Sequence, residues 1–136
     1  MPRVYRSMTR DGDKPLIGDS ASALGVRVPI DIEPDGEGKV HPGSRGMSVA
    51  PDWRKLPDHR IPTRLRIHVP KARGNYKLAC FRMGEGPFED GPLTNDLLLR
   101  IDKKTHGVVS PASAVSLEQY RAALASTQDQ WVIDEE

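Results

Sequence analysis

The segment VHPGSRGMSVAPDW, residues 40–53, combines residue types that could contact a ligand. Gly46 has no side chain, so another group can approach its backbone closely. Ser48 carries a hydroxyl that both donates and accepts hydrogen bonds, and Pro51 ends the short alternating piece 47–50. One interpretation is a turn that leads into a short strand. The other is a pocket wall that contacts a ligand through backbone and hydroxyl groups.

Positive charge is concentrated in residues 54–73. This stretch holds seven lysines and arginines against one aspartate, whereas the net charge of the whole chain is only +1. The cations are Arg54, Lys55, Arg60, Arg64, Arg66, Lys71 and Arg73. Such a patch can neutralise phosphates, or it can simply be a solvated face. No nucleic-acid motif accompanies it, and few aromatic residues are available to stack on bases.

The histidines and the cysteine give weaker signals. None of the four histidines pairs with another at metal-ligand spacing, and we expect no metal site. His106 lies after a lysine pair and before Gly107, where a structural role competes with a functional one. Cys80 is single, cannot form an internal disulfide and is expected in the core. Nucleophile-elbow, phosphate-loop and dinucleotide motifs are absent.

Length and composition indicate one domain, residues 1–136, of the α+β class with more strand than helix. The chain is 37% hydrophobic, and its 12 glycines and 12 prolines are spread throughout, which favours short elements joined by tight turns. A helix over 116–126 is predicted from Ser116 as N-cap with Gln119 three residues later, and one or two helical turns over 19–25. Strands are expected over residues 2–6, 47–50, 63–69, 76–83, 95–102 and 130–136.

The alternation in residues 63–69 predicts a strand with Leu65, Ile67 and Val69 facing inward. No apolar run reaches the roughly 18 residues that a membrane span needs, and residues 1–15 contain no apolar stretch that could serve as a signal peptide. We therefore expect a protein made in the cytoplasm, without a membrane partner.

Several short motifs, taken in order, resemble a known family. VYR, DGEGKVHP, GMSVAPD, LACFRMGEG, LLLRID and THGVVSPASAVSLEQY follow one another over residues 4–120. This order resembles the type VI secretion antibacterial effector toxins with an ADP-ribosyltransferase-like fold. The family's usual His-Tyr pair reads His106–Gly107 here.

The resemblance implies a split, mostly antiparallel β core with few short helices and a cleft that accepts NAD. Arg6 would bind a phosphate or ribose of the dinucleotide, Ser48 would support the nicotinamide ribose, and His106 would take the third catalytic position. Gly46 and Met47 would line the NAD site beside Ser48. We expect Arg6, Ser48 and His106 to converge on one cleft.

The resemblance also implies growth inhibition in the cytoplasm of the producing or target cell, and a cognate immunity protein. We expect substitution of Arg6 or Ser48 to relieve inhibition without unfolding the chain. The alternatives are a catalytically inactive relative, or a module that binds nucleic acid or a protein partner through residues 54–73. An RNA phosphotransferase would also use arginine clusters.

Overall fold

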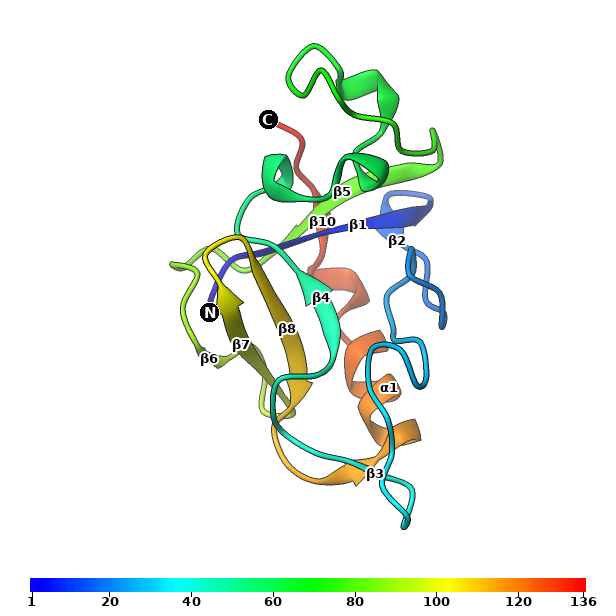
Figure 1. Cartoon of the computed structure of the whole chain (residues 1–136), viewed down its shortest axis with the longest axis vertical. Coiled ribbons are helices and arrows are strands. Elements are labelled where there is room, and N and C mark those ends of the chain that lie inside the picture. The colour runs from blue at the N-terminus through cyan, green and yellow to red at the C-terminus, as the bar shows by residue number, and fades with distance from the viewer.

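Two four-stranded antiparallel sheets form the framework of the molecule (Figure 1). The computed structural model describes residues 1–136. The first sheet has the order β10-β5-β1-β2, and the second has the order β4-β8-β7-β6. Their strands are β1 Val4–Asp11, β2 Lys14–Pro15, β5 Leu78–Met83 and β10 Val132–Ile133 in the first sheet, and β4 Met47–Val49, β6 Gly91–Pro92, β7 Leu97–Lys103 and β8 His106–Pro111 in the second.

The two sheets meet at a single backbone bridge. Tyr5 of β1 and Ala50, just after β4, exchange hydrogen bonds of 2.8 and 2.9 Å between their backbone groups. Strands from opposite ends of the first fifty residues are therefore held side by side. The α+β class with mostly antiparallel strands is confirmed.

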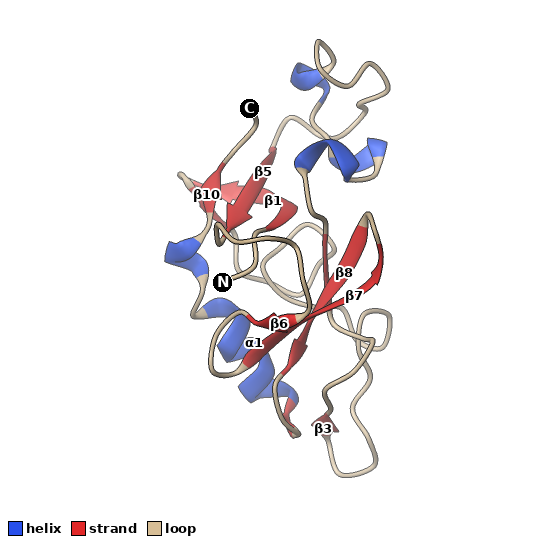
Figure 2. Ribbon diagram, turned by 90° about the vertical axis from the view of Figure 1, so that its left-hand side faces the viewer, coloured by secondary structure: helices blue, strands red, loops and turns tan.

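Helical structure is sparse, and loops connect most strands (Figure 2). The one α-helix is α1, Leu117–Ala125, and the predicted capping box at its start is present: the Ser116 hydroxyl accepts from the Gln119 backbone N–H. A small ladder pairs β3, Lys39–Val40, with β9, Val115–Ser116. The 3-10 turns are η1 Trp53–Lys55, η2 Asp58–Arg60, η3 Thr63–Leu65 and η4 Gln128–Gln130. No helix in the structure is long and apolar enough to span a bilayer.

Apolar side chains from both sheets and from α1 share the main core. Phe81 of β5, Leu99 of β7 and Tyr120 of α1 are all fully buried there. A second, smaller core around Trp53 and Cys80 lies beneath the segment that carries η1 to η3. The predicted burial of Cys80 is confirmed, and burial, with Glu135 adding to it, raises the pKa of its thiol to about 12.

The prediction of a strand over residues 63–69 is wrong. The segment is a compact turn in which the His68 and Val69 backbone N–H groups donate to the Leu65 carbonyl, at 3.0 Å each. Leu65 and Val69 pack on the small core, whereas Ile67 is 86% exposed. A separation of four residues returns to the same face in a helical turn as well as in a strand, so alternation alone does not distinguish the two. Prolines at both ends also disfavour extended pairing.

The helical turns predicted over residues 19–25 are also wrong. Leu24 instead pairs with the chain just before it, and its N–H donates to the Leu16 carbonyl at 2.8 Å. The bend leaves the carbonyls of Ala21 and Ala23 outside any helix. They are available to a side chain from β1.

Candidate functional site

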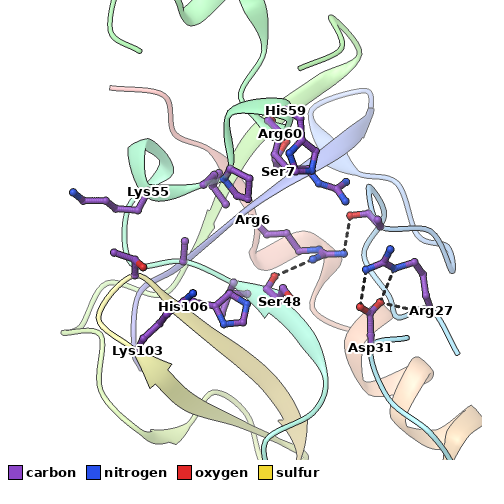
Figure 3. A pocket seen from close by; sticks show the side chains of 16 residues that line it. Arg6, Ser7, Arg27, Asp31, Ser48, Lys55, His59, Arg60, Lys103 and His106 are labelled. Carbon is purple, nitrogen blue, oxygen red and sulfur yellow. Dashed lines mark hydrogen bonds and ion pairs between the residues drawn. The ribbon is translucent and has the colours of Figure 1, made fainter. Parts of the chain in front are cut away.

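A pocket of about 350 Å3 lies at the junction of the two sheets (Figure 3). Its 16 lining residues come from β1, the loop 21–31, β4 with Ala50, the segment 55–60 and the turn between β7 and β8. Segments far apart in sequence therefore build it. The expected convergence is present as geometry, because Arg6, Ser48 and His106 all line this pocket.

Sheet register explains why Ser48 and His106 are neighbours. Ser48 of β4 lies opposite Val108 of β8, and His106 is two residues before Val108 on the same strand. Side chains two apart on a strand point to the same face. Both polar side chains therefore face the pocket, whereas Met47 points into the core. The Ser48 hydroxyl makes no hydrogen bond within the chain, so it is free for a ligand.

Arg6 is only 7% exposed, and backbone carbonyls occupy most of its guanidinium. Its Nε and Nη2 donate to the Ala23 carbonyl at 3.2 and 3.0 Å, Nη2 also donates to Ala21 at 3.2 Å, and Nη1 donates to Ser48 at 2.9 Å. An arginine has five N–H groups, so one remains for a ligand. Arg6 therefore joins the loop 21–23 to β4, and its expected contact with a phosphate or ribose would use the one remaining N–H.

No carboxylate is hydrogen-bonded to Arg6. Burial lowers the pKa of its guanidinium to about 10; the charge of Asp31 opposes this effect, and that of Arg60 adds to it. A cation held by neutral carbonyls keeps its charge, so Arg6 contributes positive potential to the pocket.

His106 is held by a carboxylate that sequence analysis missed. Its Nδ1 lies 2.7 Å from Oδ1 of Asp102, across the turn between β7 and β8. Burial alone would raise the pKa of Asp102, but the hydrogen bond and charge of His106 outweigh it and the pKa lies below its ordinary value. With Nδ1 engaged by an acceptor, the neutral ring presents Nε2 as the proton acceptor. The signal in the sequence is the spacing of four in DKKTH.

Four further cations line the pocket: Arg27, Lys55, Arg60 and Lys103. The only carboxylate among the lining residues is Asp31, which forms an ion pair with Arg27 at 2.9 Å. Lys55 and Arg60 belong to the basic stretch noted in the sequence. Arg27 and Lys103 carried no sequence signal, since their proximity depends on how a loop and a hairpin pack.

Gly46 and Met47 are not among the residues that line this pocket, and their expected contact with NAD stays a prediction. Gly46 has φ +153°, and a Cβ there would lie 2.2 Å from the Val109 carbonyl oxygen and 2.8 Å from the Tyr120 hydroxyl. That hydroxyl also accepts from the Met47 N–H at 3.2 Å. The close approach that glycine permits is therefore to the protein's own interior.

The rest of the basic stretch leaves the pocket and forms the loop at the upper end of the molecule in Figure 1. Part of its charge is neutralised locally, because Arg64 donates to Glu135 at 2.7 Å and Arg54 lies 3.7 Å from Asp52. Lys71 and Arg73 are exposed and make no ion pair.

No group of three or more metal-ligating side chains gathers anywhere in the structure. No protein-family model, curated protein or solved structure matches the chain.

Proposed function

We propose that this protein is an NAD-dependent ADP-ribosyltransferase-like toxin that inhibits the growth of target cells. One observation carries the proposal: Arg6, Ser48 and His106, which lie far apart in sequence, line a single cationic pocket between two sheets. Its volume is at the small end of the range for ligand sites, about 300–1,000 Å3. The pocket would enclose the reactive part of a dinucleotide and leave the remainder at the rim.

The lining residues fit the parts of NAD. Arginine and lysine suit the pyrophosphate, and the free Ser48 hydroxyl suits a ribose hydroxyl. No glutamate lines the pocket: Glu85 contacts Arg82 at 3.7 Å, and Glu118 lies in the first turn of α1. The role of the third polar group therefore goes to His106.

The proposed reaction breaks one glycosidic bond, forms one new bond at the same carbon and transfers one proton. NAD supplies a ribose whose bond to nicotinamide breaks, with the bonding electrons leaving on nicotinamide. An acceptor nucleophile forms the new bond to the same ribose carbon, and its proton passes to His106 Nε2. Asp102 stabilises the protonated ring through the 2.7 Å contact. The products are the ADP-ribosylated acceptor, nicotinamide and one proton.

Growth and nicotinamide release test this proposal together. We expect induced wild-type protein to stop growth in bacterial cytoplasm, and purified protein to release nicotinamide from NAD. Ser48→Ala should lower the rate of nicotinamide release about a hundredfold and relieve the growth inhibition. The melting temperature of this variant should stay unchanged. Ser113→Ala, an exposed serine outside the pocket, is the matched control. A harmless wild type without nicotinamide release would contradict the proposal. A cognate immunity protein is expected to restore growth.

The exposed basic loop favours a second candidate, binding of nucleic acid or an acidic partner. Lys71 and Arg73 are exposed there, and Tyr76, 78% exposed, is available for stacking. RNA retention that falls steeply with salt, in a protein that neither inhibits growth nor cleaves NAD, would favour this candidate. Arg73→Gln should then weaken RNA retention.

A further inference from the structure

Positive charge in the pocket exceeds negative charge by a wide margin. Asp31 is the one lining carboxylate, and it is fully used by Arg27: Oδ2 accepts from the Arg27 backbone N–H at 2.7 Å and from Nε at 3.1 Å, and Oδ1 accepts from Nη2 at 2.9 Å. The other lining cations have no carboxylate partner within ion-pair distance; these are Arg6, Lys55, Arg60 and Lys103. The chain therefore leaves several positive charges facing one cavity.

Arg27 and Arg60 each retain several donors for a ligand, whereas Arg6 retains one. Only one N–H of Arg60 is engaged, by the Ser22 hydroxyl at 3.0 Å, so four of the five remain. Arg27 uses two side-chain N–H groups on Asp31 and keeps three. The ammonium group of Lys103 makes no hydrogen bond at all.

The arginines among these cations, Arg6, Arg27 and Arg60, also repel one another. Burial lowers the pKa of Arg60, and the charge of Arg27 lowers it further. Like charges gathered in a partly enclosed site are unfavourable, and a bound anion would relieve that repulsion.

We propose that Arg27, Arg60 and Lys103 form a subsite for the pyrophosphate of a nucleotide. A carboxylate brings one negative charge, whereas a pyrophosphate brings several charges and many acceptor oxygens, which match the free donors better. The apolar wall formed by Leu56 and Pro57 leaves room for an organic group beside the phosphates. As an assignment of the pyrophosphate of NAD, the inference rests on the proposed function.

Calorimetric titration of the full chain with three probes tests the subsite directly. ADP-ribose and inorganic pyrophosphate should both bind and raise the melting temperature. Adenosine, which lacks phosphate, should bind at least about tenfold more weakly than ADP-ribose. Failure of pyrophosphate and ADP-ribose to bind at low salt would overturn the subsite.

Neutral variants distinguish the pocket from general surface charge. Arg60→Gln and Lys103→Gln should each weaken ADP-ribose binding about tenfold. Lys103→Gln is safe for the fold, since the exposed ammonium group bonds nothing. Arg73→Gln removes an exposed arginine outside the pocket and should leave ADP-ribose binding unchanged. Equal weakening in all three variants would overturn the proposal.

Different results would refute the subsite proposal and the transferase proposal. ADP-ribose binding that Arg60→Gln and Lys103→Gln weaken, without nicotinamide release from NAD, supports the subsite and refutes the transferase. Nicotinamide release that both variants leave intact supports the transferase and refutes the subsite.

Discussion

Replacing Arg6 by alanine should destabilise the fold, because the guanidinium joins two parts of the chain. The variant leaves the carbonyls of Ala21, Ala23 and Ser48 without their charged donor. At about 2 kcal/mol for each lost partner, the loss is about 6 kcal/mol.

An opposing effect reduces this loss. The wild type buries a cation whose pKa is lowered from 12.5 to about 10, which corresponds to a burial cost of about 3 kcal/mol that the variant avoids. The net expectation is a free energy of unfolding lower by about 3 kcal/mol, or a melting temperature lower by about 10 °C.

Urea denaturation followed by circular dichroism measures this difference. The matched control is Arg73→Ala, an exposed arginine that bonds no other group, which should stay within about 0.5 kcal/mol of wild type. If Arg6→Ala unfolds within about 1 kcal/mol of that control, the carbonyl contacts of Arg6 do not stabilise the protein as argued. Because Arg6 is buried and hydrogen-bonded, Arg6→Ala would combine a loss of stability with any loss of catalysis, and Ser48→Ala is the cleaner test of catalysis.

Substitutions at three further residues, with their controls, probe other features. Asp102→Asn should slow nicotinamide release about tenfold or more with little change in KM. Asp102→Glu should recover part of the rate. An unchanged pH–rate profile in Asp102→Asn would show that Asp102 does not position His106. Gly46→Ala should lower the melting temperature, since its Cβ meets a carbonyl of β8 at 2.2 Å, whereas Gly43→Ala, in open space, should not. Burial alone would raise the pKa of Asp134, but the hydrogen bonds that its carboxylate accepts outweigh burial and depress the pKa below 3.8. The ionised carboxylate therefore stabilises the fold fully above about pH 4, and this stabilisation is lost as the pH falls through the depressed pKa. Denaturation curves between pH 7 and 2.5 should show a weaker loss in Asp134→Asn than in wild type, and parallel losses would contradict the argument.

Structural elements that depend on residues close together in the sequence could be predicted from the sequence. The capping box of α1 needs only Ser116 and Gln119, three residues apart. The strands at 78–83 and 97–103 follow from local apolar content, and the burial of Cys80 follows from its place in the first of them. The convergence of Arg6, Ser48 and His106 was predicted from a resemblance in motif order, and their chemical roles remain proposals.

Features that depend on packing between distant segments could not be predicted. Residues 63–69 form a turn because Leu65 and Val69 pack on the small core, which other segments build. A spacing of four residues fits a helical turn as well as a strand, so the sequence alone did not distinguish them. Gly46 faces Val109 and Tyr120 instead of a ligand, and Arg6 is occupied by carbonyls that an unpredicted bend exposes. The sequence by itself determined the local elements, because their hydrogen bonds close within a few residues. Only the tertiary structure decided which cations share a pocket, because charges far apart in sequence interact only after the fold brings them to the same cavity.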